Sequence, residues 1–191
     1  QDEASLRAWH AAFERRDPQA HHAFLTRLGL NEKETLYVRH ISKNLENDSM
    51  HYFYELFEEL PRQGVGCASA TVRALDSLKG LPEKPAVLDI GCGSGLQTLI
   101  LAERLKTAVT AIDNHRPVLE RLKEAAELRR LNIAAQEASM FDLPFKQHSF
   151  DLIWAEGSIF VIGLERGLNE WRRYLKPGGY LAFSEMCWLE A

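Results

Sequence analysis

Cysteine, long apolar runs and an excess of positive charge are all scarce in this sequence. The three cysteines, Cys67, Cys92 and Cys187, form no C-x-x-C pair, which argues against a disulfide scaffold and fits a reducing compartment. No apolar run approaches the roughly 20 residues that a bilayer-spanning helix needs, and the opening segment has no apolar core typical of a secretory signal. These absences predict a cytoplasmic chain with no membrane span.

The net charge and the histidine spacing argue against nucleic acid and metal ions as ligands. The formal net charge of −4 provides no sequence-wide positive field for a phosphate backbone, so no nucleic-acid partner is expected. The histidines show no H-E-x-x-H or H-x-x-x-H spacing, and therefore no metal site is expected. With 46% hydrophobic residues over 191 positions, the chain can build one ordinary globular core.

Two parts of the chain differ in residue composition and hydrophobic pattern. Residues 1–80 are rich in helix formers, and Leu6, Trp9 and Phe13 follow the spacing of an amphipathic helix. The dipeptide Asp17-Pro18 either ends that helix or begins the next. Further helices are expected over residues 50–60 and 68–78. We therefore expect a helical N-terminal appendage over residues 1–80 and a second domain over residues 81–191.

From Pro85 onward, short apolar runs alternate with helical patterns. Strands are expected at 86–90, 108–112, 133–137, 150–154 and 180–184, with helices in between and a turn at K-P-G-G, residues 176–179. Such alternation predicts an α/β fold, Rossmann-like and doubly wound, with a mostly parallel sheet covered by helices on both faces.

A glycine turn follows the first of these strands, in the segment VLDIGCGSG over residues 87–95. Glycines at Gly91, Gly93 and Gly95 let the backbone pass close to a ligand, and ligands bind at the carboxyl ends of the strands in open α/β sheets. The dinucleotide fingerprint G-x-G-x-x-G requires glycine at position 96, which is Leu96 here. Asp89 also places negative charge where phosphates would approach, whereas an ammonium or sulfonium ligand would tolerate it.

This segment resembles motif I of the class I S-adenosylmethionine-dependent methyltransferases, and later segments resemble further elements of that family in order. The resemblance spans roughly residues 50–186 and implies S-adenosyl-L-methionine as the cofactor. It implies that Asp113 accepts the two ribose hydroxyls and that Asn114 lies beside the adenine. It also assigns cofactor contacts to Asp89, Gly91 and Gly93, and to Cys92 through its backbone N–H.

The segments DLPF and KPGG look most like small-molecule methyltransferases, of which the quinone-biosynthesis C-methyltransferases are familiar relatives. The run at residues 51–66 is similar to a bacterial subgroup in which Tyr54, Gln63 and Gly64 would cap the methionine end of the cofactor. Many relatives have an aspartate in the adenine loop, where this chain has Ser139. The hydroxyl of Ser139, or Asp142, would accept from the adenine amine, and the Met140 N–H would serve a ring nitrogen. The family's closing C-terminal hairpin is expected to be missing.

Methyl transfer from a sulfonium chiefly needs alignment and exclusion of water, and a base only if the acceptor must lose a proton. Glu156 and His51, with Tyr54, are the candidate acid–base groups for a small-molecule methyl acceptor whose methylated atom is O, N or C. Two alternatives stay open: a non-catalytic module that binds S-adenosylmethionine, and a dinucleotide-dependent oxidoreductase. The oligomeric state is left open, with a homodimer among the options.

Overall fold

The structure is a computed structural model that describes residues 9, 11–43, 60, 62–64 and 66–185. The chain divides into two compact units, residues 1–65 and 66–191. This division differs from the expected boundary at 80/81, because α5 (Ala68–Ser77) packs with the second unit. Leu75 of α5 shares a buried cluster with Leu101, and Asp76 accepts from the Arg104 guanidinium at 2.8 Å.

The first unit contains two described helices with clear starting signals. Asp17 caps α2 (Pro18–Arg27), because its Oδ1 accepts the backbone N–H groups of Gln19 and Ala20 at 3.1 and 2.8 Å. The dipeptide Asp17-Pro18 thus begins a helix, and the residues before it, Trp9 and 11–16, are also helical. The helix expected over residues 50–60 lies outside the described residues, apart from Leu60.

Helix α3 (Glu32–Lys43) was not expected from the sequence. Its signal was present, since Asn31 and Glu34 form a reciprocal capping box. The Asn31 Oδ1 accepts the Glu34 N–H at 3.0 Å, and the Glu34 carboxylate accepts the Asn31 N–H at 2.6 Å. Leu25 of α2 and Val38 of α3 then meet in a buried cluster.

A buried group of charged side chains joins these helices. Glu14, whose side chain is 1% exposed, receives the Arg39 guanidinium on both oxygens, at 3.0 Å each. The ring Nδ1 of the fully buried His21 lies 2.8 Å from the same carboxylate. Burial raises the pKa of Glu14, but the hydrogen bonds from Arg39 and His21 outweigh it and leave the pKa below its ordinary value. Glu14 is therefore charged and fully engaged at neutral pH.

Substituting Glu14→Gln is expected to destabilise the helical unit by about 3 kcal/mol, because the change leaves the Arg39 charge and His21 without their carboxylate. Hydrogen exchange over residues 18–43, followed by mass spectrometry, measures the loss. The matched control is Glu32→Gln, which removes an exposed carboxylate 3.5 Å from His22 and should leave exchange unchanged. Equal exchange in both variants would contradict the prediction.

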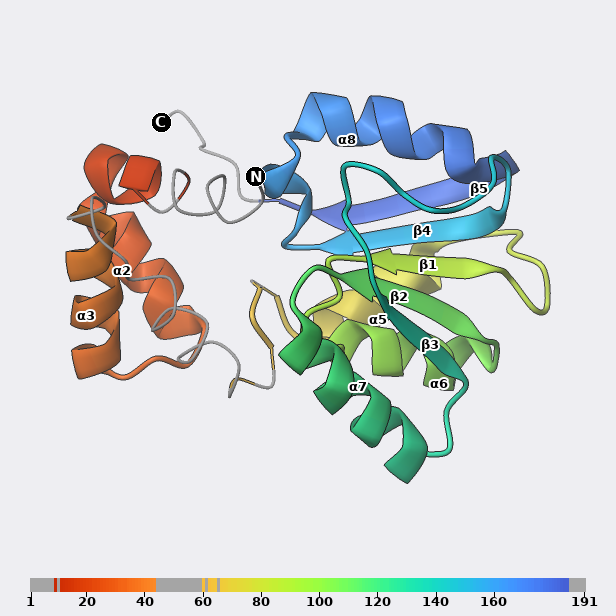
Figure 1. The fold of residues 1–191 in the computed structure, drawn as a ribbon, viewed down its shortest axis with the longest axis horizontal. Coiled ribbons are helices and arrows are strands. Elements are labelled where there is room, and N and C mark those ends of the chain that lie inside the picture. The colour runs from red at the N-terminus through yellow and green to blue at the C-terminus, as the bar shows by residue number, and fades with distance from the viewer. Residues whose placement is uncertain (1–8, 10, 44–59, 61, 65, 186–191) are drawn as a thin grey trace. The chain divides into compact units, whose positions relative to one another are not determined.

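The second unit contains a five-stranded sheet in the order β3-β2-β1-β4-β5 (Figure 1). All four neighbouring pairs are parallel, which confirms the predicted sheet. The strands are β1 (Val87–Ile90), β2 (Val109–Asp113), β3 (Ile133–Glu137), β4 (Phe150–Glu156) and β5 (Leu175–Ser184). The chain moves outward from β1 through β2 to β3 and then returns to the other side of β1 for β4.

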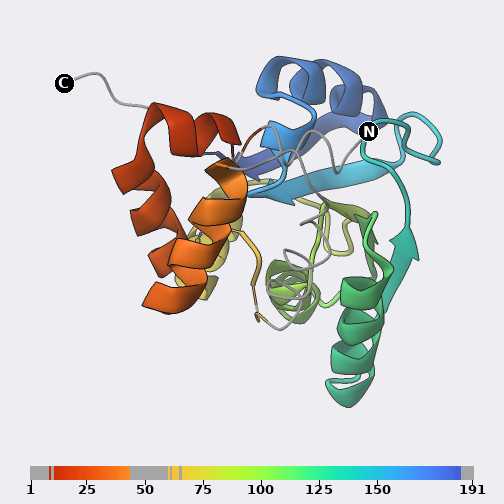
Figure 2. The same cartoon turned by 60° about the vertical axis from the view of Figure 1, so that its left-hand side comes forward.

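Helices cover both faces of this sheet, as predicted. On one face lie α5, α6 (Leu96–Leu105) and α7 (Arg116–Leu128), and on the other lies α8 (Leu164–Trp171) (Figures 1 and 2). Alternate residues of β1 divide between the two sides, since Val87 joins the α5–α6 cluster and Leu88 joins the cluster containing Trp171. No helix among the described residues is long and apolar enough to cross a membrane.

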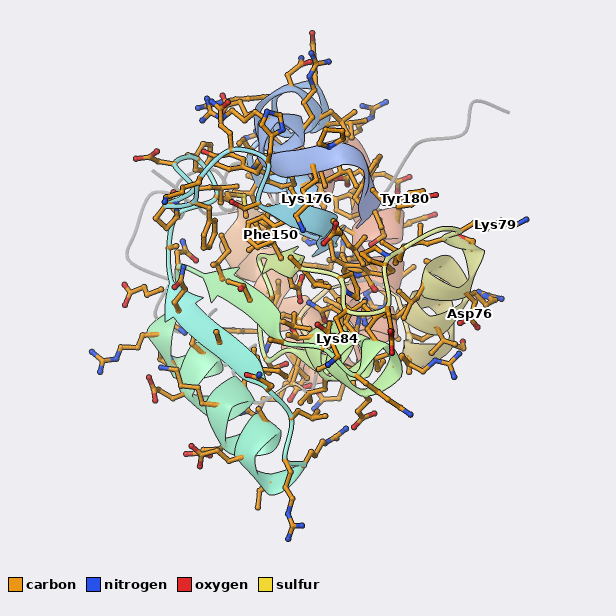
Figure 3. All side chains as sticks on the ribbon, turned by 90° about the vertical axis from the view of Figure 1, so that its right-hand side faces the viewer. Asp76, Lys79, Lys84, Phe150, Lys176 and Tyr180 are labelled. Atoms are coloured by element: carbon orange, nitrogen blue, oxygen red, sulfur yellow. The ribbon has the colours of Figure 1, made fainter. Side chains whose placement is uncertain are left out.

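The KPGG segment differs from the expected turn, because it lies within β5. Phe150 pairs with Leu175 and Leu152 pairs with Tyr180, so residues 176–179 bulge opposite Asp151. The Asp151 carboxylate stabilises this irregularity by accepting from the Ala86 N–H at 2.8 Å and from Lys176 Nζ at 2.7 Å. Figure 3 shows this end of the sheet, with Phe150, Lys176 and Tyr180 labelled.

Candidate cofactor site

The glycine turn lies at the point where the strand order reverses. It connects β1 to α6, and β1 is paired with β2 on one side and with β4 on the other. The connection from β1 runs to β2 on one side, whereas the connection from β4 runs to β5 on the other. Ligands of open α/β sheets bind at such a reversal, outside the carboxyl ends of the strands. Every cofactor contact predicted for the second unit lies near the carboxyl end of a strand or in the segment that follows that end.

Two of the three glycines are required by packing within the protein. Gly91 has φ +70°, and a Cβ there would lie 2.5 Å from Ser158 Cβ. Gly95 has φ +81°, and a Cβ there would lie 2.3 Å from Leu122 Cδ1 on α7. Both left-handed conformations also disfavour any residue with a side chain. The turn is thus held between the segment after β4 and helix α7.

Asp113, at the end of β2, ties the turn to the neighbouring strand. Its Oδ2 accepts the Gly93 N–H at 2.9 Å, and its Oδ1 accepts the His115 N–H at 3.0 Å. Burial raises the pKa of Asp113, while these backbone hydrogen bonds act against the shift. A carboxylate offers about four lone-pair sites, so Asp113 keeps acceptor capacity for a ligand hydroxyl beside these backbone donors. Asn114 follows Asp113 and is exposed.

Asp89 is a fully buried acid on β1. Its Oδ2 accepts the Thr98 hydroxyl of α6 at 2.6 Å, and its Oδ1 has no hydrogen-bond partner among the described residues. Burial raises the pKa of Asp89 to about 7, and the nearby Glu156 charge adds to the shift although the Thr98 hydrogen bond opposes it. A buried carboxylate in this state favours a cationic ligand.

Glu156 ends β4, two residues beyond Trp154, which pairs with Asp89 in the sheet. The Trp154 indole donates to Glu156 Oε1 at 2.8 Å, and the Glu156 residue is 9% exposed. Ser158 follows and donates its hydroxyl to the Ile90 carbonyl at 2.6 Å. The exit of β4 is therefore fixed beside the glycine turn, and Glu156 is held in place by a side-chain donor.

The loop after β3 contains the residues predicted to bind adenine. The Ala138 N–H donates to the Asp113 carbonyl at 3.0 Å, which brings the start of the loop to the end of β2. The Ser139 hydroxyl oxygen accepts the Phe141 N–H at 3.3 Å. The methyl carbon of Met140 lies 3.4 Å from the Cβ position of Gly91. The loop thus lies against the glycine turn, while Asp142 is exposed.

One predicted contact is wrong as stated. The Cys92 N–H was expected to face the cofactor, but it donates to the Ile112 carbonyl at 3.0 Å. The reason is that the turn extends the β1–β2 hydrogen bonding by one step, so this donor is used within the protein. The Cys92 side chain is 2% exposed and packs among apolar residues, as expected.

The N-terminal candidates fall in the first unit or outside the described residues. His51 and Tyr54 lie outside them. Gln63 donates its side-chain amide to the Leu60 carbonyl at 3.2 Å, and the Gly64 carbonyl accepts from Arg62 at 3.2 Å. The cofactor contacts of Tyr54, Gln63 and Gly64 and the acid–base role of His51 therefore stay predictions.

Sequence reasoning missed Thr98, Ser158 and Trp171. Thr98 lies nine residues after Asp89 and on the buried face of α6, where an isolated threonine among apolar residues was a detectable signal. The contacts of Ser158 and Trp171 join distant segments and have no local signature. Among the described residues, no group of three or more histidine, cysteine, aspartate or glutamate side chains could hold a metal ion.

Comparison with known proteins assigns a family to this site. Residues 87–179 match the family described as "Methyltransferase domain". The chain is 36% identical over 100 residues to the uncharacterized methyltransferase YodH of Bacillus subtilis, an alignment covering 52% of this chain and 42% of that protein. It is 37% identical over 100 residues to a 2-phytyl-1,4-naphtoquinone methyltransferase of a Nostoc species, covering 50% of this chain and 44% of that protein. The chain thus spans less than half the length of these two relatives.

A solved structure shares the fold. The geranyl diphosphate C-methyltransferase of Streptomyces coelicolor superposes with a TM-score of 0.57 at 21% identity, covering 71% of this chain and 50% of that one. The matched family region runs from β1 to the KPGG segment of β5 and so contains the glycine turn, Asp113 and the loop after β3. With the sheet order and the site geometry, these likenesses identify residues 87–179 as a domain of the class I S-adenosylmethionine-dependent methyltransferase type.

Proposed function

We propose that this chain transfers a methyl group from S-adenosylmethionine to a small-molecule acceptor. The observation that carries the proposal is the gathering of Asp89, Asp113 and Glu156 at the carboxyl edge of the sheet, with the pKa of both aspartates raised. This edge disfavours the phosphates of a dinucleotide and favours a ligand that carries positive charge. Relatives named as small-molecule methyltransferases support the same assignment.

The residues present fit the cofactor at its nucleoside end. The remaining acceptor sites of Asp113 suit the two ribose hydroxyls, since a carboxylate accepts a pair of hydrogen bonds. Asn114 would border the adenine, the Met140 N–H would serve a ring nitrogen, and Ser139 or Asp142 would accept from the exocyclic amine. The Ser139 oxygen already accepts the Phe141 N–H, but a hydroxyl has a second acceptor site.

At the other end, the orphaned Asp89 oxygen fits a cationic group. Asp89 would face the positive charge of the methionine part, which is also the part of the cofactor that the resemblance assigns to Tyr54, Gln63 and Gly64. When bound, S-adenosylmethionine supplies an electrophilic methyl group on a sulfonium. The chain's own residues then align the acceptor, exclude water and remove a proton where the acceptor has one to lose.

Glu156 is the described residue that we assign to proton removal, with His51 and Tyr54 as the other candidates. Its carboxylate is held by the Trp154 indole at 2.8 Å, so the group is oriented before any acceptor arrives. Such orientation suits a general base, which must lie within hydrogen-bond reach of the proton that it removes.

The proposed function is tested by two measurements on the whole chain. Calorimetric titration should show S-adenosylhomocysteine binding and no NAD binding, and labelled methyl groups from S-adenosylmethionine should appear in a fraction of a metabolite pool. Binding of NAD alone would instead establish an oxidoreductase. Binding of S-adenosylhomocysteine with no labelled product in any fraction would establish a non-catalytic module.

Glu156→Gln is expected to lower the rate of methyl transfer to the acceptor fraction at saturating cofactor by about 100-fold, because general bases contribute on that order. Affinity for S-adenosylhomocysteine should change little, since glutamine keeps an oxygen for the Trp154 indole. A matched control is Glu137→Gln at the end of β3, where the side chain is exposed. A loss of affinity with an unchanged rate would instead assign Glu156 to the cofactor's amino group.

A further inference from the structure

The loop that carries the predicted adenine contacts is held by two aromatic residues, one at the end of α8 and one three residues after it. The indole N–H of Trp171 donates to the Met140 carbonyl at 3.1 Å. The hydroxyl of Tyr174, three residues on, donates to the Leu143 carbonyl at 3.2 Å. Two side chains three residues apart thus bind two backbone carbonyls of the loop that are also three residues apart.

The Met140–Phe141 peptide is held on both sides. Its carbonyl oxygen receives the Trp171 indole, and its N–H donates to the Ser139 hydroxyl oxygen at 3.3 Å. The ring of Phe141 is also covered by the Arg166 guanidinium of α8, at 5.1 Å from the ring centroid. Because the orientation of this peptide is fixed, the positions of the Met140 N–H and of the Ser139 hydroxyl are restricted with it.

Burial makes the Trp171 contact rigid. Trp171 is 0% exposed and lies in the core cluster that includes Leu88, Ile153 and Ile159. A fully buried indole has little room to move, and its hydrogen bond to the Met140 carbonyl, which is itself part-buried, is less exposed to competition from water than a surface hydrogen bond. Trp171 therefore connects the loop to the sheet, because it packs against residues of β1 and β4.

We propose that Trp171 is a positioning residue for the nucleobase end of the cofactor site. By holding the Met140 carbonyl, it places the Met140 N–H and the Ser139 hydroxyl where they distinguish adenine from other bases. This inference rests on the proposed function, because it assumes an adenine nucleoside at this loop. Trp171 itself touches no ligand, and Tyr174 anchors the far end of the loop.

The test is Trp171→Phe, which keeps an aromatic ring and removes the N–H. Calorimetry should show binding of S-adenosylhomocysteine and of adenosine weakened by about three- to tenfold, the range that corresponds to one lost hydrogen bond. The decisive quantity is the ratio of affinities for S-adenosylhomocysteine and S-inosylhomocysteine, which should fall by a similar factor. Partial unfolding lowers the binding stoichiometry and leaves this ratio unchanged.

The matched control is Tyr174→Phe, which removes a similar aromatic-to-carbonyl hydrogen bond from the same segment. Its stability should fall, but the ratio of affinities should stay within about twofold of the original, because Leu143 lies beyond the predicted adenine contacts. A Trp171→Phe variant that keeps both the affinity and the ratio would overturn the inference. If the unaltered chain bound neither S-adenosylhomocysteine nor adenosine, the proposed function would fail with it.

A second measurement needs no change at Trp171. In the ¹⁵N-labelled chain, which has four tryptophans, the indole resonance of Trp171 should shift on saturation with adenosine and stay unshifted with homocysteine. Substituting the other tryptophans one at a time assigns the resonance. If the Trp171 indole resonance did not shift when adenosine bound, the positioning role would be contradicted, whether or not the Trp171→Phe variant folds.

Discussion

Asp113→Ala is expected to weaken the binding of S-adenosylhomocysteine by at least about 100-fold, which corresponds to about 2.7 kcal/mol. Hydrogen bonds to a charged group contribute about 1.5–3 kcal/mol each, and the substitution removes both of those proposed for the ribose. In the unaltered chain the Gly93 and His115 N–H groups donate to the Asp113 carboxylate at 2.9 and 3.0 Å. The substitution also removes this acceptor. The turn therefore loses its link to β2 at the same time as its ligand contact.

A carboxylate at the other end of the sheet separates these two effects. Asp151 also accepts a backbone N–H, that of Ala86 at 2.8 Å, and it lies at the start of β4. Asp151→Ala should lower the unfolding temperature without changing the affinity for S-adenosylhomocysteine. Isothermal titration of both variants checks this, and equal losses of affinity in the two would show that Asp113 acts only through stability.

Binding of S-adenosylmethionine is expected to release a proton near pH 6.5, and Asp89 is the group that releases it. The pKa of Asp89 is raised from 3.8 to about 7 by burial, with the Glu156 charge adding to the shift. A cationic ligand favours the charged form and lowers this pKa again. Affinity should therefore rise with pH by up to about tenfold per unit below pH 7 and level off above it.

Calorimetry in two buffers of different ionisation enthalpy counts the released proton. The Asp89→Asn variant should release none, whereas Asp76→Asn, which changes an exposed acid paired with Arg104, should behave like the unaltered chain. Release with S-adenosylmethionine but not with S-adenosylhomocysteine would identify the sulfonium as the charge that Asp89 faces. Undiminished release by Asp89→Asn would contradict the assignment.

The raised pKa of Asp89 also makes the ligand-free chain less stable as the pH rises. Between pH 3.8 and about 7 the folded chain retains a proton on Asp89 that the unfolded chain has lost, so the free energy of unfolding falls as pH rises through this window. Above pH 7 the loss amounts to about 4 kcal/mol. Asp89→Asn should remove it, and urea unfolding at pH 5 and pH 8 measures the difference between the two proteins.

The strands, their parallel arrangement and the location of the glycine turn could be read from the sequence, because each has a local signature. The strands at 87–90, 109–113 and 133–137 agree with the expected ones to within a residue. Glycine spacing and the acid at Asp113 are likewise visible within a short segment. The residue contacts that make up the site, by contrast, join segments far apart in the chain.

Several local patterns were read wrongly or missed because their meaning depends on neighbours in space. The KPGG segment is typical of a turn, yet it continues β5, since the Asp151 carboxylate and the bulge accommodate it. The capping box of Asn31 and Glu34 is an exception, since it was overlooked although its two residues lie only three positions apart. The unit boundary moved to 65/66 because α5 packs on α6.

By itself the sequence determined the α/β class and the location of the glycine turn, and its resemblance to a known family predicted S-adenosylmethionine as the ligand. Only the tertiary structure decided why Gly91 and Gly95 must be glycine, since Ser158 and Leu122 occupy the space of a side chain. It also decided that the Cys92 N–H is committed to the Ile112 carbonyl and that the Trp171 indole binds the Met140 carbonyl in the loop after β3. The physical reason is that periodicity and turn chemistry act between chain neighbours, whereas sheet order brings the ends of β1, β2 and β4 together.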